Sequence, residues 1–411
     1  MTAEESVAEL GELARSAGAD VLGCALQVRE RPVPATLIGS GKLLEIQAWA
    51  AETDCDFVMF DHDLTPSQHR NLERELETPV LDRTQLILDI FAKHARTREG
   101  RLQVELAQLD YLLPRLAGRG TSMSRLGGGI GTRGPGETQL EHDRRKIRTR
   151  IAKLRSDLEK VRATRRLQRA KRSSVPIPTF ALCGYTNAGK STLFNALTKA
   201  SVVADRRMFA TLDPTIRKLR LPSRRPALLS DTVGFIRNLP PALVQAFRAT
   251  LEEVTEATLI LHVVDLSAEH GAVHRDQVNR ILKDLGARDK PQLLVLNKRD
   301  LIERSATERA VQRLEGSAAR VIAVSAKTGD GLDQLLDSID ALLSQGAVLR
   351  KQFRIPYAAG RDLAFLYEHG RVLERRDGDD GVDVLAEVSA ALANRLAVYG
   401  ERNDSGAECL Q

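Results

Sequence analysis

The stretch Gly184-Tyr-Thr-Asn-Ala-Gly-Lys-Ser-Thr192 decides the fold, because it matches the phosphate-binding loop pattern Gly-x4-Gly-Lys-Ser. An apolar run at residues 179–183 precedes it, and an amphipathic pattern follows it. In a strand-loop-helix setting, backbone N–H groups and the helix N-terminus form a nest for phosphates. Lys190 is expected to reach the β- and γ-phosphates, and Ser191 to bind Mg²⁺. The stretch therefore predicts a nucleoside-triphosphate site.

A second motif, Asp231-Thr-Val-Gly234, follows the apolar run at residues 227–230. It supplies a carboxylate, which we expect to reach the metal through a water molecule. It also supplies a glycine whose N–H can bond the γ-phosphate. The predicted site therefore includes the metal and the reacting phosphate.

Two further motifs, Asn297-Lys-Arg-Asp300 and Ser325-Ala-Lys327, also follow apolar runs. In open α/β sheets, ligands bind at the carboxyl ends of strands, where these motifs are expected to lie. Asp300 can accept hydrogen bonds from the ring N–H and the exocyclic amine of guanine, whereas adenine has no such donor pair. At roughly 1.5–3 kcal/mol for each charge-assisted bond, the two bonds favour GTP by about 3–6 kcal/mol.

The domain that holds these motifs resembles translational GTPases of the Ras-like P-loop class, and residues 33–345 resemble the HflX family. Three stretches carry the closer resemblance: Phe209-Ala-Thr-Leu-Asp-Pro-Thr215, Asp231-Thr-Val-Gly-Phe-Ile236 and Gly128-Gly-Ile-Gly-Thr-Arg-Gly-Pro-Gly-Glu137. The resemblance implies a GTPase that binds the large ribosomal subunit and splits stalled or idle ribosomes under stress.

The motifs and the resemblance together predict a set of nucleotide contacts. These are Gly184, Tyr185, Thr186, Asn187, Ala188, Gly189, Lys190, Ser191, Thr192, Phe209, Ala210, Thr211, Leu212, Asp213, Asp231, Thr232, Val233, Gly234, Asn297, Lys298, Arg299, Asp300, Ser325, Ala326 and Lys327.

By resemblance, Thr211 is the switch threonine that closes on Mg²⁺, so the expected metal ligands are Ser191, Thr211 and Asp231. The expected catalytic residues are Lys190, Thr211, Gly234 and Asn187. Similar GTPases use an asparagine at the position of Asn187 to coordinate K⁺. The alternative is that Asn187 hydrogen-bonds the switch loop.

One departure from the general GTPase pattern concerns Phe235, where many relatives carry a glutamine that orients the attacking water. A phenyl ring cannot hydrogen-bond water. We therefore expect hydrolysis to be slow in the isolated protein, or to use another group, such as one that the ribosome supplies.

The positive charge is concentrated in one segment. The whole chain has 61 basic and 55 acidic residues, a net of +6, but residues 141–172 alone hold fourteen Arg or Lys against four Asp or Glu. Such a stripe is the electrostatic footprint of a nucleic-acid partner. The alternative is a solvated linker helix.

Two heptad patterns, one ending near Pro114 and one at residues 140–161 within the basic segment, predict an antiparallel helical hairpin. Residues 114–137 between them hold eight glycines, four arginines and one acid. We expect this loop to contact RNA, because glycines allow close approach and arginines hold phosphates or stack on bases. The resemblance implies that the partner is ribosomal RNA, and we expect no DNA partner. A flexible linker is the alternative. The candidate contacts are Arg115, Arg119, Arg125, Arg133, Arg144, Arg145 and Arg148.

The pattern predicts an α/β fold in four parts. An N-terminal α/β subdomain at 1–82 has buried strands at 21–28 and 56–60, with helices opening near Ser40 and covering 66–76. A helical hairpin at 83–174 carries the loop 114–137. A Ras-like GTPase domain at 175–345 and a small α+β domain at 346–411 follow.

Composition excludes several classes of protein. With 42% hydrophobic, 28% charged and 4% aromatic residues, the chain is not collagen-like or wholly disordered. Its longest apolar runs fall far short of the ~18 residues that a membrane span needs. The acidic start does not resemble a signal peptide. Four scattered cysteines favour neither a disulfide framework nor a zinc site. We expect a cytoplasmic monomer.

Two other functions remain open at this point. The chain is also consistent with a ribosome-assembly GTPase that acts on immature large subunits. A GTP-gated RNA-binding module with negligible turnover is the other alternative, which Phe235 favours.

Overall fold

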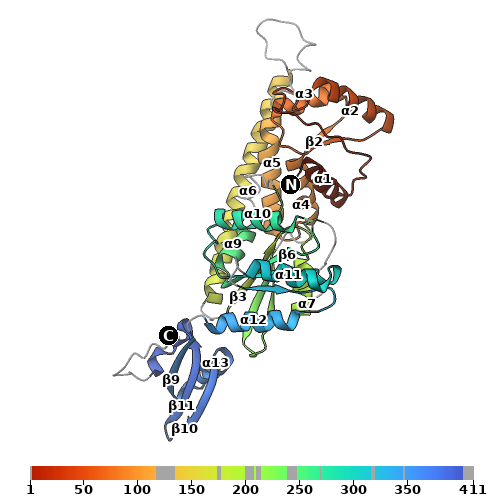
Figure 1. The fold of residues 1–411 in the computed structure, drawn as a ribbon. Helices are drawn as coiled ribbons and strands as arrows, with labels where there is room; N and C mark the ends of the chain where they lie inside the picture. The colour runs from red at the N-terminus through yellow and green to blue at the C-terminus, as the bar shows by residue number, and fades with distance from the viewer. Residues whose placement is uncertain are drawn as a thin grey trace.

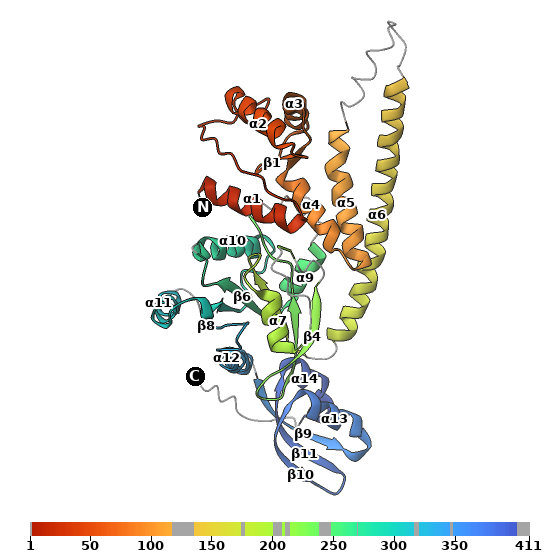
Figure 2. The same ribbon diagram turned by 90° about the vertical axis from the view of Figure 1, so that its right-hand side faces the viewer.

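The computed structural model describes residues 2–116, 135–173, 177–199, 208–209, 214–237, 248–268, 270–315, 320–345 and 348–400. The predicted α/β class is confirmed, with the region predicted to be the GTPase domain between N-terminal and C-terminal domains. In Figures 1 and 2, the N-terminal helices and a long helical arm lie at one end, the GTPase domain in the middle and a small α+β domain at the other end.

The GTPase domain is built on a six-stranded sheet with the order β4-β5-β3-β6-β7-β8, in which only β4 runs antiparallel to its neighbour. Its strands are β3 (Thr179–Gly184), β4 (Thr215–Arg220), β5 (Pro226–Asp231), β6 (Leu259–Asp265), β7 (Gln292–Asn297) and β8 (Val321–Ala323). Parallel strands buried on both faces have nearly continuous apolar sequences, which is why these runs could be recognised.

Helices cover both faces of this sheet. They are α7 (Lys190–Thr198), α9 (Arg248–Glu256), α10 (Gly271–Asp284), α11 (Arg304–Glu315) and α12 (Leu332–Gln345), with a short 3₁₀ turn, η2 (Arg299–Leu301). Apolar residues of α9 and α10 pack on one face, and those of α7 and α12 on the other. The core of the first face continues into the N-terminal helices α1 (Ala3–Ala17) and α4 (Arg83–His94). The N-terminal domain is therefore packed directly against the GTPase domain.

The N-terminal domain contains a two-stranded parallel sheet, β1 (Val58–Phe60) and β2 (Val80–Asp82), with α2 (Ser40–Thr53) and α3 (Pro66–Leu76). The helices begin where the sequence predicted them. The predicted strand at residues 21–28 is wrong, because this segment pairs with neither β1 nor β2. Its apolar side chains are largely exposed, and Val28 retains 94% of its accessible surface.

The arm consists of α5 (Arg98–Arg115) and α6 (Pro135–Ser173), which lie side by side in both views. The first heptad pattern proves to be two helices rather than one. Helix α4 ends at His94, the backbone of Ala95 is extended, and the Thr97 hydroxyl caps α5 by accepting the Gly100 N–H at 3.0 Å. The predicted seam of α6 is buried against its neighbours at Ile151, Leu154 and Leu158.

The C-terminal domain is a three-stranded antiparallel sheet, β10-β11-β9, with helices on one side. Its elements are β9 (Val348–Pro356), η3 (Tyr357–Ala359), α13 (Gly360–His369), β10 (Arg371–Asp377), β11 (Gly381–Ser389), α14 (Ala390–Arg395) and η4 (Ala397–Tyr399). Strands β10 and β11 form an antiparallel hairpin. Among the described helices of the whole chain, none is both long and apolar enough to cross a membrane.

Candidate nucleotide and metal site

The phosphate-binding loop lies between β3 and the N-terminus of α7, as its sequence predicts. Gly189, the residue before α7, has φ +86°, and a Cβ atom there would lie 2.3 Å from Asn297 Nδ2. A larger residue would therefore displace the loop. Asn297 holds the same loop, because its Nδ2 donates to the Ala188 carbonyl at 2.9 Å.

Lys190 is buried beneath the loop, with 7% of its surface accessible. Its Nζ donates to the carbonyl oxygens of Gly184 at 3.1 Å and Tyr185 at 2.8 Å, which fixes the ammonium group inside the loop. Burial lowers the pKa of Lys190 to about 8, although Asp231 acts in the opposite direction. The Lys190 ammonium group therefore loses its proton at a lower pH than an ordinary lysine does.

We expect the affinity for GTP to fall as the pH rises through about 8. Below that pH Lys190 is an ammonium that attracts phosphate, and above it the free protein holds a neutral amine that must first take up a proton. The loss should approach tenfold per pH unit above the pKa. Equilibrium titrations with a fluorescent GTP analogue between pH 6.5 and 9 measure it. An affinity that stays constant over that range would contradict the titration of Lys190.

Two oxygen donors meet where a divalent cation is expected. The Ser191 hydroxyl donates to Asp231 Oδ2 at 2.8 Å, and Asp231 is fully buried at the end of β5. Hydroxyl and carboxylate oxygens are the ligands that Mg²⁺ prefers, so these residues fit the ion. The next residue, Thr232, donates its hydroxyl to the Leu182 carbonyl at 2.6 Å and ties the motif to β3.

The segment after Asp231 pairs with the phosphate-binding loop. Phe235 donates its N–H to the Gly184 carbonyl at 3.0 Å, and its own carbonyl accepts the Thr186 N–H at 2.8 Å. The preceding residue, Gly234, lies beside Lys190, because a Cβ atom on Gly234 would be 3.0 Å from Lys190 Nζ. The Phe235 side chain is 1% exposed and belongs to the apolar core.

The base-recognition motifs meet at the ends of β7 and β8. Asn297 Oδ1 accepts the Ala326 N–H at 3.0 Å, and the Ser325 hydroxyl donates to Asp300 Oδ1 at 2.6 Å. Lys298 forms an ion pair with Asp265 at 2.7 Å. The Asp300 carboxylate is oriented by Ser325 and remains exposed at this edge.

Of the expected switch segment, residues 205–215, the structure describes residues 208–209 and 214–215. Phe209 packs edge-on against Phe91 of α4, with ring centroids 4.5 Å apart. Ala210, Thr211, Leu212 and Asp213 lie outside the described residues, as do Arg119, Arg125 and Arg133 of the loop.

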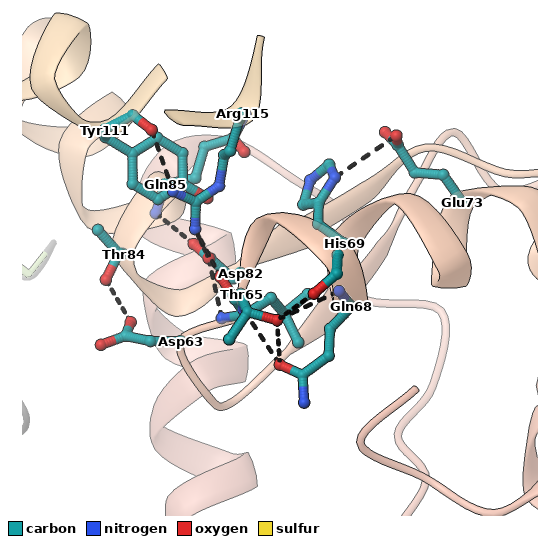
Figure 3. Close-up of polar contacts among 12 residues, drawn as sticks. Asp63, Thr65, Gln68, His69, Glu73, Asp82, Thr84, Gln85, Tyr111 and Arg115 are labelled. Carbon is teal, nitrogen blue, oxygen red and sulfur yellow. Dashed lines mark hydrogen bonds and ion pairs between the residues drawn. The ribbon is translucent and has the colours of Figure 1, made fainter. Parts of the chain in front are cut away.

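Of the predicted RNA contacts, Arg115 is corrected to a structural residue. Its guanidinium donates to the Leu64 carbonyl at 2.7 Å and pairs with buried Asp82 at 3.0 Å (Figure 3). It also lies 3.4 Å from the centroid of the Tyr111 ring, and only 16% of its side chain is accessible. These contacts fix the end of α5 to the N-terminal domain. Arg145 and Arg148 of α6 are exposed, and Arg144 is half-buried.

Sequence reasoning missed the part of the site that comes from the N-terminus. Glu9 of α1 accepts a hydrogen bond from the Tyr185 hydroxyl and forms an ion pair with Arg83 of α4. No local pattern signals a contact between residues 176 positions apart. The sequence signal is limited to Glu9 itself, an acid that lies on the apolar face of a helix.

Four family models match the chain. Those described as GTP-binding GTPase N-terminal and GTP-binding GTPase Middle Region match residues 4–92 and 94–172. The model described as 50S ribosome-binding GTPase matches residues 179–298, and the one described as HflX C-terminal domain matches residues 310–403.

Two curated relatives match nearly the whole chain. GTPase HflX of Caldanaerobacter subterraneus is 48% identical over 394 residues, which are 96% of this chain and 90% of that protein. GTPase HflX of Escherichia coli K12 is 45% identical over 377 residues, 92% of this chain and 88% of that protein. A solved GTP-binding protein of Sulfolobus solfataricus in complex with GDP is 28% identical, with coverage of 84% and 97% and a TM-score of 0.44.

Proposed function

This chain belongs to the HflX family of GTPases, and from that premise we propose that it binds the large ribosomal subunit and separates stalled or idle ribosomes under stress. As a member of the family it hydrolyses GTP to GDP and phosphate. The proposal includes a cytoplasmic location, a monomeric state and the division of the chain at residues 82, 174 and 345.

The observation that carries this proposal is the basic surface of α6. Arg145 and Arg148 are exposed on this helix. Arg150 and Arg155 are also exposed, but they pair with Glu105 and Asp110 of α5. The helix thus presents a row of cations to solvent, and two of them already have acidic partners. Exposed cations along a projecting arm suit the phosphate backbone of ribosomal RNA. The description of the matching model, 50S ribosome-binding GTPase, agrees with that partner.

Hydrolysis would use groups of this chain that surround the γ-phosphate. We assign Lys190 to the β- and γ-phosphates and the Gly234 N–H to the γ-phosphate, because the two residues lie side by side. Ser191, Asp231 and Thr211 would hold Mg²⁺, which neutralises charge on the phosphate oxygens when bound. We further assign K⁺ coordination to Asn187, which is exposed on the loop with φ +60°.

Phe235 is buried, and its phenyl ring cannot hydrogen-bond a water molecule. We therefore propose that the large subunit completes the catalytic arrangement and that hydrolysis then times release. The switch segment would be ordered when GTP is bound and released when GDP is bound. This change would couple the state of the nucleotide to binding of the large subunit.

The proposal is tested by adding purified ribosomal particles to the protein with GTP. Large subunits should raise the rate of phosphate release, and intact ribosomes should separate into subunits on sucrose gradients. Splitting with GTP but not with GDP supports the proposal. Stimulation by immature large subunits alone would favour a role in assembly, and unstimulated turnover would favour a nucleotide-gated binding module.

Replacing Arg148 by alanine is expected to weaken binding to large subunits and to reduce its salt dependence. One lost phosphate contact should lower the slope of log affinity against log salt by about 0.7–0.9. Binding measured by co-sedimentation at several salt concentrations checks the slope. Arg150→Ala is the matched control, because it removes the same charge from the same helix but from a guanidinium that Glu105 holds at 2.6 and 2.8 Å. Equal effects of the two changes would contradict a specific contact at Arg148.

A further inference from the structure

A buried ion pair of the N-terminal domain reaches the phosphate-binding loop. Glu9 of α1 and Arg83 of α4 are 7% and 2% exposed, and Arg83 Nη2 lies 2.9 Å from Glu9 Oε2. Asp61 binds the other end of the guanidinium at 2.5 Å. The second oxygen of Glu9, Oε1, accepts the hydroxyl hydrogen of Tyr185, the residue that follows Gly184 in the loop. The N-terminal domain therefore holds a side chain of the loop directly.

The same groups hold the backbone that follows Gly234. The Tyr185 hydroxyl oxygen accepts the Arg237 N–H at 3.1 Å, and Arg83 Nη2 donates to the Arg237 carbonyl at 3.4 Å. Both backbone groups of Arg237 are thus bonded to partners that Glu9 organises. Since Phe235 is also paired with the loop, the segment from residue 235 to residue 237 is fixed on one side by the loop and on the other by the N-terminal domain.

The charge states keep this arrangement in place near neutral pH. Burial and the neighbouring Glu9 carboxylate raise the pKa of Tyr185, so its hydroxyl stays protonated and donates to Glu9. Burial alone would lower the pKa of Arg83, but Glu9 and Asp61 raise it overall. A hydrogen bond between a hydroxyl and a buried carboxylate that is also ion-paired is among the stronger polar contacts in proteins.

We propose that Glu9 is a positioning residue for GTP hydrolysis. Through the Tyr185 hydroxyl and Arg83 it fixes the backbone at Arg237, and it thereby keeps Gly234 beside Lys190 where the γ-phosphate is bound. The inference concerns the GTPase reaction of the chain. It stands whether or not the protein splits ribosomes, because every readout below uses the isolated full-length protein.

The decisive variant is Tyr185→Phe in the full-length chain. It removes the hydroxyl and keeps the aromatic ring that stacks on His274, with centroids 3.9 Å apart and planes 7° apart. We expect kcat for GTP hydrolysis to fall about tenfold, as for the loss of one hydrogen bond to a charged group. The affinity for GDP should not change, because GDP lacks the phosphate that Gly234 contacts.

A second variant, Glu9→Gln, tests the carboxylate itself. Tyr185 and Arg83 bond different oxygens of Glu9, and glutamine puts an NH2 group in place of one of them. One of the two donors therefore loses its acceptor, so kcat should again fall by about tenfold with unchanged affinity for GDP. Glu12→Gln is the matched control on the same helix, because Glu12 is exposed and pairs only locally with Arg15 at 2.6 Å. We expect this control to keep the kcat of the parent protein.

Comparing kcat with GDP affinity distinguishes a role in positioning Gly234 from a role in keeping the whole loop folded. Unchanged kcat in Tyr185→Phe would overturn the proposal. A drop in kcat that is accompanied by an equal loss of GDP affinity would also overturn it, because the network would then maintain the loop as a whole. If Glu9→Gln does not fold, Tyr185→Phe still decides between these results.

Discussion

Replacing Asp300 by asparagine is expected to lower the affinity for GTP by about one to two decades, which corresponds to the loss of one charge-assisted bond, and to shift the preference toward xanthosine triphosphate. The carboxylate can accept from both the ring N–H and the exocyclic amine of guanine, whereas an asparagine turns one of those acceptors into a donor. Xanthine carries an oxygen in place of the exocyclic amine, so it can accept from that new donor. The Ser325 hydroxyl, which donates to Asp300 Oδ1 at 2.6 Å, can bond an amide oxygen equally well.

Competition binding against a fluorescent GDP analogue, with GTP, XTP and ATP as competitors, measures the shift. Asp330→Asn is the matched control, because Asp330 is 58% exposed and pairs with Arg299 of the same motif at 3.0 Å. That change should leave nucleotide preference as it is. Unaltered GTP binding in Asp300→Asn would refute the assignment of Asp300 to the base.

Replacing Gly234 by alanine is expected to lower kcat by about two to three decades, the loss seen when one donor to a developing charge is removed. An added Cβ atom would lie 2.9 Å from Thr186 Cγ2, 3.0 Å from Lys190 Nζ and 3.1 Å from Thr186 Cα. The last of these atoms is backbone, so we expect residue 234 to shift rather than Thr186. Its N–H would then move away from the position that we propose for the γ-phosphate, whereas the contacts to the other phosphates would remain.

Single-turnover hydrolysis and GDP titration together check this result. GDP affinity should stay within a few-fold of the parent, and Gly41→Ala in α2, where a Cβ atom would meet nothing within 4 Å, serves as the control. If kcat is retained in Gly234→Ala, the segment after Asp231 does not contribute a donor to the reaction.

The GTPase domain was predictable because its signals are local. Each motif directly follows an apolar run, and a parallel sheet buried on both faces makes those runs continuous. The order of β3, β5, β7 and β8 along the chain then brings the motifs to one edge. Helix α3 was also predictable from local signals, since its capping box is formed by Thr65 and Gln68, which are three residues apart.

Features that depend on distant contacts were not predictable. Residues 21–28 have a strand-like composition, but a strand needs a partner, and β1 and β2 pair with each other. Arg115 has the sequence surroundings of a loop cation, but it contacts Asp82 and Leu64, which are distant in the sequence. The contact of Glu9 and Arg83 with the phosphate-binding loop cannot be predicted from the sequence, because a buried ion pair between helices leaves no periodic pattern.

The burial of Phe235 limits what a substitution at that position can achieve. A glutamine introduced there would place an amide among the apolar side chains of the core, with its backbone still fastened to Gly184 and Thr186. A Phe235→Gln substitution alone is therefore not expected to speed hydrolysis in the isolated protein. The amide would first have to leave a core that the N-terminal helices α1 and α4 share with the central sheet.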